Sequence, residues 1–224
     1  MNDEASLVHR IREPAGEAEG ALILLHGRGT DETDLYPLLD ELDPERRLVG
    51  ITPGGPLTDQ PPGGRHWYIV ERVGQPDEET FVATMYTLCR FLDDFLRARG
   101  IGWEHAVIGG FSQGAAVALS AALGTARPTA AGILAMSGFL PTVRGWRLDA
   151  GAKRGMPAYI SHGAFDNMIP AGFGRRARDV LSEAGLEVTY RETRVLHSID
   201  PTLLPEMRQW LTAALAGETP KTKV

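Results

Sequence analysis

Short runs of apolar residues recur along the chain, and segments with helical spacing separate them. A continuously apolar strand is covered on both faces, which is typical of a parallel sheet. Residues 187–192 alternate polar and apolar side chains instead, which predicts a strand near the edge of that sheet. The continuously apolar runs are residues 21–25, 48–52, 105–108, 132–136 and 158–161.

The helical segments each carry one apolar stripe, with the three- and four-residue spacing of an amphipathic helix. The longest stripe runs over residues 81–96. Asp77 before it and Gly100 behind it are residue types that favour helix ends. Asp200 followed by Pro201 predicts the start of the last helix. Shorter stripes lie at residues 35–42, 173–184 and 203–214.

This alternation of strands and helices predicts an α/β fold with a mostly parallel, doubly wound sheet and helices on both of its faces. We expect one domain over residues 1–217, because no linker or internal repeat divides the chain, and a flexible C-terminal tail over residues 218–224. The Gly/Pro-rich residues 53–64 and residues 138–155 are expected to be long loops. Loops of this length in a compact domain are often functional.

The composition narrows the range of functions. Apolar residues make up 43% of the chain and charged residues 23%, as in ordinary globular proteins. The net charge of −6 argues against binding to nucleic acid or to an anionic membrane, because both require a basic surface. No apolar run is long enough to span a membrane, and the acidic N-terminus lacks the features of a signal peptide. We therefore expect a cytoplasmic protein.

The residue types that bind metals or form disulfides are sparse. The single cysteine, Cys89, excludes an internal disulfide and a cysteine-based metal site. It lies within an apolar helical stripe, which predicts a buried side chain. No group of His, Asp and Glu residues has the spacing of metal ligands, so we expect no metal.

The most informative motif is Gly110-x-Ser112-x-Gly114, which follows an apolar strand and precedes an alanine-rich helix. This is the pattern of a nucleophile elbow, in which a serine hydroxyl projects from a tight turn at the sheet edge. The glycines are needed because a side chain two residues from the serine would clash with the strand or the helix. The spacing differs from a dinucleotide fingerprint, and a phosphate-binding loop would need lysine in place of Ala115. The alternative is that Ser112 only caps a helix.

A serine nucleophile needs a base. In proteins with this elbow, an acid and then a histidine follow the serine along the chain. Only His162 and His197 follow Ser112, and His162 precedes the candidate acid Asp166. His197 is therefore the base that fits this order. Asp166 and His197 come after successive strands, so they should meet Ser112 at the same sheet edge.

Other interpretations of these residues stay open at this point. Asp166 followed by Asn167 is also typical of a turn, and His197 could be an ordinary residue of a surface loop. Asp149 in the long loop and Asp179 in a helical stripe are the other candidate acids.

An oxyanion hole needs two backbone N–H donors. One should be the N–H of Gln113, the residue after the nucleophile, and the other should come from a loop after an early strand. His26-Gly27-Arg28-Gly29 is such a loop, and Arg28 N–H is the expected donor. We expect His26 to shape this loop by hydrogen bonding rather than to take part in catalysis.

Together these segments resemble the phospholipase/carboxylesterase family of α/β-hydrolases, which includes acyl-protein thioesterases and small bacterial carboxylesterases. The resemblance implies an α/β-hydrolase fold, a serine hydrolase activity without a cofactor, and a triad of Ser112, Asp166 and His197. It also implies an oxyanion hole formed by Arg28 and Gln113. The motifs that carry it are Leu25-His26-Gly27-Arg28-Gly29, Gly110-Phe111-Ser112-Gln113-Gly114, Ser137-Gly138-Phe139-Leu140-Pro141, His162-Gly163-x-x-Asp166 and His197.

Three departures from the family pattern concern the substrate. Leu196 stands where the family often has glycine, and the turn after Asp166 contains the bulky Met168. Arg28 stands where acyl-protein thioesterases often have an apolar residue, which favours a small soluble ester over a lipidated protein. The Arg28 side chain either contacts an acidic group of the substrate, or it points to solvent or pairs with a carboxylate in residues 31–34.

The expected substrate pocket consists of apolar and aromatic residues near these motifs, and ordinary core packing is the alternative for each. Two of them, Trp67-Tyr68, match a Trp-Phe pair that borders the active site in the family. The expected pocket residues are Trp67, Tyr68, Phe139, Leu140, Phe165, Met168 and Ile199.

The sequence therefore predicts a serine hydrolase that cleaves carboxylic esters or thioesters through an acyl-enzyme on Ser112, with a small molecule as substrate. An acyltransferase, in which an alcohol replaces water, and a catalytically inactive binding protein are the alternatives. The pattern is compatible with a homodimer, and it leaves the acyl group and the alcohol or thiol open.

Overall fold

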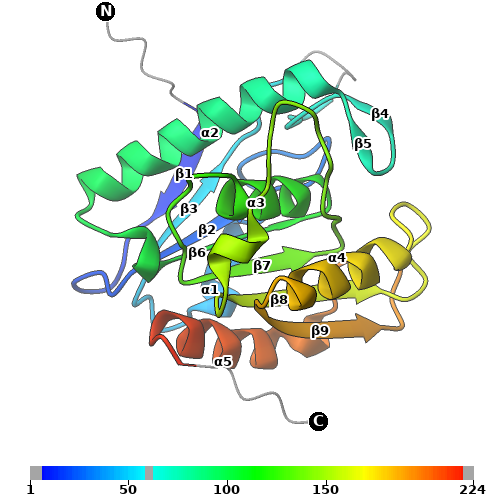
Figure 1. Ribbon diagram of the computed structural model, residues 1–224. Coiled ribbons are helices and arrows are strands. Elements are labelled where there is room, and N and C mark those ends of the chain that lie inside the picture. The colour runs from blue at the N-terminus through cyan, green and yellow to red at the C-terminus, as the bar shows by residue number, and fades with distance from the viewer. Residues whose placement is uncertain (1–6, 59–62, 219–224) are drawn as a thin grey trace, which may run out of the picture.

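The computed structural model describes residues 7–58 and 63–218, except for the side chain of Glu71, and a seven-stranded sheet runs through its centre (Figure 1). The strands are β1 His9–Arg12, β2 Ala21–Leu25, β3 Val49–Pro53, β6 Ala106–Phe111, β7 Gly132–Met136, β8 Pro157–Gly163 and β9 Glu187–Thr193. They lie in the order β1-β3-β2-β6-β7-β8-β9. Only β1 runs antiparallel to its neighbour, and all the other pairs are parallel.

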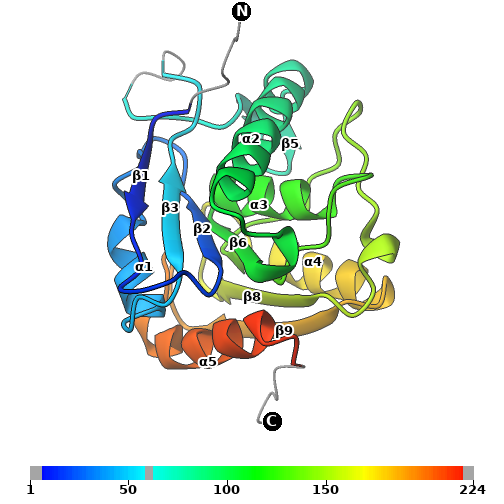
Figure 2. The same cartoon turned by 90° about the vertical axis from the view of Figure 1, so that its left-hand side faces the viewer.

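Helices cover both faces of the sheet (Figure 2). The α-helices are α1 Tyr36–Leu42, α2 Glu78–Ala98, α3 Gln113–Leu123, α4 Gly172–Glu183 and α5 Leu204–Leu215. Core residues of α2, α3 and α4 pack on one face, whereas those of α1 and α5 pack on the other. Short 3-10 helices lie at Trp103–His105, Ala150–Lys153 and Pro201–Leu203.

Alternate residues of one strand enter two separate layers of core. In β2, Ile23 packs in the layer that contains α2 and α3, whereas Leu22 and Leu24 pack in the layer that contains α1 and α5. All three side chains are fully buried. Because neighbouring side chains of a strand point to opposite faces, a strand with helices on both faces must be apolar throughout. The predicted α/β fold with a mostly parallel sheet is confirmed.

Several short elements differ from the prediction. The pattern missed β1 and also a separate small hairpin, β4 Val70–Arg72 and β5 Gln75–Pro76. The strand expected at residues 105–108 is longer, because β6 continues through the glycines to Phe111. Asp200 caps a 3-10 turn ahead of α5, with its carboxylate accepting from the N–H of Thr202 at 2.9 Å.

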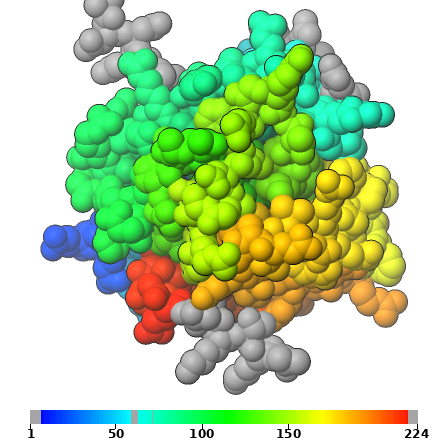
Figure 3. All heavy atoms as spheres, in the orientation of Figure 1, coloured from blue at the N-terminus to red at the C-terminus, as the bar shows by residue number. Residues whose placement is uncertain are grey.

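The long loop over residues 138–155 lies across the outer face between α2 and α4 (Figure 3). It helps to cover α3, in which every residue is buried. Of the expected loop at residues 53–64, positions 59–62 lie outside the described residues, as does all of the expected tail except Glu218. Within the described ranges, no helix has the length and apolar character needed to cross a bilayer.

A buried ion pair holds β1 at its edge of the sheet. Arg12 is 2% exposed and Asp43 is 4% exposed, and Arg12 Nη2 donates to Asp43 Oδ2 at 2.5 Å. The same guanidinium donates to the carbonyl oxygens of Leu39 and Leu48, and the N–H of Leu48 donates to the Asp43 carboxylate. The pair therefore joins β1 to the end of α1 and to the start of β3.

Replacing Asp43 by alanine should lower the free energy of unfolding by about 3–5 kcal/mol, because it leaves a buried guanidinium without its partner. Asp40→Ala is the matched control. Asp40 also contacts Arg12, at 3.3 Å, but its side chain is 46% exposed, and exposed ion pairs contribute about 0–1 kcal/mol. Urea unfolding followed by circular dichroism measures both variants. Equal losses in the two variants would contradict the assigned role of Asp43.

Candidate active site

Ser112 lies at the sharp turn between β6 and α3, with φ 56° and ψ −116°. A positive φ is uncommon for a residue that has a side chain, and it marks a strained turn. A Cβ on Gly110 would lie 2.5 Å from the carbonyl carbon of Gly114, and a Cβ on Gly114 would lie 2.1 Å from the carbonyl oxygen of Leu25. The two glycines are therefore required by close packing around the serine.

His197 lies on the loop that follows β9, beside Ser112. Its Nε2 is 2.8 Å from Ser112 Oγ, and its Nδ1 is 2.6 Å from Asp166 Oδ2. An ionised carboxylate can only accept, so Nδ1 carries the hydrogen and Nε2 is left to accept from the serine hydroxyl. The ring of Phe111 packs against the imidazole with 4.8 Å between ring centroids. The hydrogen bonds and this ring contact together orient the imidazole.

Asp166 lies on the loop that follows β8, and its side chain is fully buried. Its Oδ1 accepts from the N–H groups of Met168 and Ile169 at 2.9 and 2.8 Å, while Oδ2 faces His197. The sequence left two roles open for Asp166, a turn residue or a partner of the histidine. The carboxylate has both contacts, because Oδ1 bonds within the turn and Oδ2 bonds to His197.

The other candidate acids lie elsewhere. Asp149 is at the C-terminal end of α3, where its N–H donates to the carbonyl oxygen of Leu123. Ser112 precedes the opposite end of this 11-residue helix. Asp179 lies on the outside of α4 in an exposed ion pair. The structure brings Ser112, Asp166 and His197 together and leaves these two acids apart from them.

His162, at the end of β8, supports Asp166 through a contact that sequence reasoning missed. Its Nε2 donates to the carbonyl oxygen of Ile169 at 2.8 Å and lies 3.4 Å from Asp166 Oδ2. Its other face is against α4, where a Cβ on Gly174 would lie 2.5 Å from His162 Nδ1. The signal that could have revealed this contact is the His-Gly-x-x-Asp motif, which places both residues at one strand end.

Gln113 ties the elbow to the segment that crosses it. The buried side chain accepts from the N–H of Trp67 and donates to the carbonyl oxygen of Tyr68, both at 2.8 Å. Trp67 Nε1 in turn donates to the carbonyl oxygen of His26 at 2.9 Å. The Gln113 N–H lies in the first turn of α3, where N–H groups have no acceptor within the helix. It is therefore free of helical hydrogen bonding, next in the chain to Ser112.

His26 is 1% exposed and bonds to two loops. The N–H of Gly55 donates to His26 Nε2 at 2.9 Å, so the ring hydrogen is on Nδ1, which donates to the carbonyl oxygen of Gly27 at 2.6 Å. Burial lowers the pKa of this imidazole, which agrees with a neutral ring. These contacts fit the expected role of His26 in shaping the loop that carries Arg28.

Ser112 and His197 open into two cavities, of about 850 Å³ and about 100 Å³. The larger one extends between α1 and the segment from His197 to Leu204. The smaller one lies under the β4–β5 hairpin. The residues that line both are Arg28, Ser112, Met168 and His197. The candidate nucleophile therefore lies where the two cavities meet.

The expected pocket residues divide into two groups. Tyr68 and Phe139 line the smaller cavity, Ile199 lines the larger, and Met168 lines both. The remaining three line neither cavity: Trp67 is fully buried, Leu140 packs against the core, and Phe165 is 54% exposed. Sequence reasoning missed walls contributed by α1, the hairpin and the start of α5, among them Leu38, Val70, Val73 and Leu204.

Arg28 has an exposed side chain that lines both cavities. The nearby carboxylates are engaged with other groups. Glu32 pairs with Arg65 at 3.4 Å, and Asp31 and Asp34 accept from threonine hydroxyls. In the part of the chain that the structure describes, Arg28 forms no ion pair.

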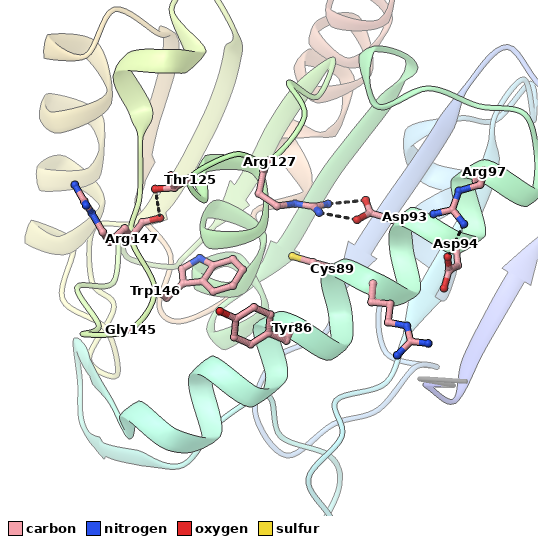
Figure 4. A pocket seen from close by; sticks show the side chains of 11 residues that line it. Tyr86, Cys89, Asp93, Asp94, Arg97, Thr125, Arg127, Gly145, Trp146 and Arg147 are labelled. Atoms are coloured by element: carbon pink, nitrogen blue, oxygen red, sulfur yellow. Dashed lines mark hydrogen bonds and ion pairs between the residues drawn. The ribbon is translucent and has the colours of Figure 1, made fainter. Parts of the chain in front are cut away.

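A third hollow, of about 540 Å³, lies along α2 at the C-terminal end of α3 (Figure 4). Arg127 makes two hydrogen bonds of 2.7 Å to Asp93, and Trp103 Nε1 donates to the same carboxylate. Burial raises the pKa of the Cys89 thiol to about 11, so the thiol stays protonated at neutral pH. These contacts join α2 to the segment after α3. Asp93 and Arg127, which line the hollow, therefore have a structural role.

The arrangement at Ser112 can remove a proton from a hydroxyl and stabilise the resulting charge. The imidazole can accept the proton, the buried carboxylate can stabilise the imidazolium, and backbone N–H groups lie at the helix start. Among residues 7–58 and 63–218, no three His, Cys, Asp or Glu side chains are grouped so that they could hold a metal ion.

Known proteins are similar to this chain in sequence and in fold. A sequence model of the Phospholipase/Carboxylesterase family matches residues 7–215. Acyl-protein thioesterase 1 of Candida albicans is 28% identical over 200 residues, which cover 80% of this chain and 85% of that protein. Lysophospholipase-like protein 1 of Mus musculus is 26% identical over 231 residues, 96% of each chain. The carboxylesterase from Mesorhizobium loti has the same fold, with a TM-score of 0.81 at 24% identity over 95% of this chain and 97% of that one.

Proposed function

The chain belongs to the phospholipase/carboxylesterase family, and we propose that it is a serine hydrolase that cleaves carboxylic esters or thioesters through an acyl-enzyme on Ser112. The observation that carries the proposal is the line of hydrogen bonds from Ser112 through His197 to Asp166, at 2.8 and 2.6 Å. The family membership and the strained turn at Ser112 support it.

The reaction has two halves. In the first, Ser112 Oγ attacks the carbonyl carbon and passes its proton to His197 Nε2. The bond to the alcohol or thiol then breaks, and the leaving group takes that proton. In the second half, water gives a proton to His197 Nε2 and attacks the acyl carbon. The acid is released, and Ser112 Oγ regains its proton.

Asp166 and the backbone donors stabilise the charges that arise. The Asp166 carboxylate keeps the hydrogen on His197 Nδ1 and stabilises the imidazolium without taking its proton. The oxyanion binds to the N–H groups of Gln113 and Arg28. The N-terminus of α3 adds a favourable dipole at the same point.

The substrate proposed here is a small ester or thioester. Two relatives carry the names acyl-protein thioesterase and lysophospholipase-like protein, which indicate bonds of this class. The Arg28 side chain lines both cavities at the level of Ser112. A long alkyl chain placed there would remove water from a guanidinium without replacing its hydrogen bonds, which is costly. This favours short acyl groups over lipid chains.

A fluorophosphonate probe tests the proposal. We expect one covalent adduct, located by mass spectrometry on the peptide that contains Ser112. Ser120→Ala is the matched control. Ser120 lies in α3, the helix that follows Ser112, and its fully buried side chain donates a hydrogen bond to the carbonyl oxygen of Ala116. This variant should be labelled like the wild type, whereas Ser112→Ala should not be labelled.

The alternatives give other results. An unlabelled wild-type protein would indicate a binding protein, and an adduct at another residue would overturn the role of Ser112. Methyl ester as the main product when methanol is added would indicate an acyltransferase.

A further inference from the structure

We propose that the acyl group of the substrate ends in a carboxylate, which binds in the smaller cavity to Arg28, Arg72 and Tyr68. The proposal rests on the function proposed above and names its substrate class: esters or thioesters of short dicarboxylic acids in which one carboxyl group is free.

The two cavities at Ser112 differ in charge. The described residues that line the smaller cavity include Arg28 and Arg72 and no aspartate or glutamate. The larger cavity has Asp34 and Glu41 in its wall beside Arg28. A carboxylate is therefore attracted into the smaller cavity, while the acidic wall of the larger cavity opposes it. A cationic part of a substrate has the opposite preference.

Arg72 is held in position for such a contact. Its Nε donates to Gln75 Oε1 across the β4–β5 hairpin, which orients the guanidinium. Among the carboxylates that the structure describes, which do not include that of Glu71, none forms an ion pair with Arg72 or Arg28. A guanidinium binds a carboxylate through two parallel N–H groups, and this geometry suits a terminal carboxylate better than a neutral group.

Tyr68 supplies a third polar group to the smaller cavity. Its side chain is 2% exposed, and it lines the smaller cavity. Its hydroxyl makes no hydrogen bond to the described residues and keeps some accessible surface, so it is open to the cavity and available to a ligand there. Burial raises the pKa of this phenol, so it remains protonated and can donate. A carboxylate in the cavity would accept that hydrogen.

The size of the cavities assigns the carboxylate to the acyl side of the bond. The acyl group stays attached to Ser112 between the two halves of the reaction, whereas the alcohol or thiol must leave before water enters. The smaller cavity, of about 100 Å³, suits the part that stays, and the larger one, of about 850 Å³, suits the part that leaves. The small volume, with Val70, Val73 and Phe139 in its wall, limits the acyl group to a short chain.

The test compares two esters of equal acyl length, monoethyl glutarate and ethyl pentanoate, by the ethanol released. The wild type should have a higher kcat/KM for monoethyl glutarate. Arg72→Gln and Arg28→Gln should each reduce this preference by about 10- to 100-fold, the range for a hydrogen bond to a charged group. Tyr68→Phe should reduce it by about 2- to 10-fold, the range for a neutral donor.

Each variant is judged by the ratio between the two substrates, so a general loss of activity does not mimic the effect. Arg176→Gln is the matched control, because Arg176 is an exposed arginine of α4 that lines neither cavity. It should leave the ratio unchanged. Arg72→Lys should retain part of the preference, since it keeps the charge and loses the paired geometry.

The outcomes separate this proposal from the function on which it rests. Labelling of Ser112 by a fluorophosphonate together with equal kcat/KM for the two esters would overturn the carboxylate site and leave the hydrolase intact. A preference for 3-(pentanoyloxy)propanoate over ethyl pentanoate, without one for monoethyl glutarate, would place the anion on the alcohol and overturn the assignment. A protein that is neither labelled nor active on any ester would overturn both proposals.

Discussion

Ser112→Ala should lower kcat for ester hydrolysis on the order of 10⁶-fold, as loss of the nucleophilic serine does in subtilisin. The effect is large because no acyl-enzyme can form, and the remaining rate comes only from the oxyanion donors and from substrate binding. Steady-state hydrolysis of ethyl pentanoate measures it, and thermal unfolding shows whether the variant keeps its fold.

The same experiment has an informative extension. His197→Ala should lower kcat nearly as much as Ser112→Ala does. The double variant should lower kcat only a little further than either single variant, because the two groups act as a unit. Ser198→Ala is the control, since Ser198 is exposed and lines the larger cavity next to the histidine. Wild-type turnover in Ser112→Ala, or additive losses in the double variant, would show that another residue is acylated.

Asp166→Asn should lower kcat by on the order of 10⁴-fold, as loss of the acid does in a serine protease. The hydrogen bonds fix the direction of the new amide. Its oxygen must face the N–H groups of Met168 and Ile169, which now donate to Oδ1. The NH₂ group is then turned to His197 Nδ1, which must become an acceptor. The remaining ring hydrogen moves to Nε2, so the imidazole can no longer accept the proton of Ser112.

This variant is nearly isosteric, so its fold should be retained, and circular dichroism and thermal unfolding check this. Asp149→Asn is the matched control, because Asp149 caps a 3-10 helix and lies at the far end of α3. Its kcat should stay within a factor of a few of the wild type. A large loss of kcat in Asp149→Asn, together with nearly unchanged kcat in Asp166→Asn, would show that Asp149 is the acid instead.

The central strands could be predicted because their burial is continuous, and the helices because their burial is periodic. A strand covered on both faces, such as β2, is apolar at every position, and the stripe of α2 recurs with the period of a helix. β1 carries no such signal. Its one fully buried residue is Arg12, which is buried only because Asp43, 31 positions away in the chain, neutralises it. A pattern of apolar residues cannot indicate a strand that is anchored by charge.

The candidate site likewise has residues that a local sequence pattern predicts and residues that depend on a distant segment. Ser112 could be predicted as a candidate nucleophile because a strained turn demands glycines at fixed spacing, and His197 as a candidate base because of its order in the chain. The roles of His162 and of the Gln113 side chain could not be derived locally, since each depends on where another segment lies. The cavity walls from the β4–β5 hairpin were missed because strands of three and two residues leave no periodic pattern.

The two hydrogen bonds of the Gln113 side chain couple the wall of the smaller cavity mechanically to the nucleophile. Its amide meets a donor on Trp67 and an acceptor on Tyr68, a pairing that glutamate cannot complete and that asparagine is too short to span. The segment with Tyr68 cannot shift alone without leaving these buried groups unpaired, at about 1–3 kcal/mol for each group. A ligand that displaces this wall either breaks these hydrogen bonds or also displaces the turn that presents Ser112, so fit in the cavity is linked to the position of the Ser112 hydroxyl.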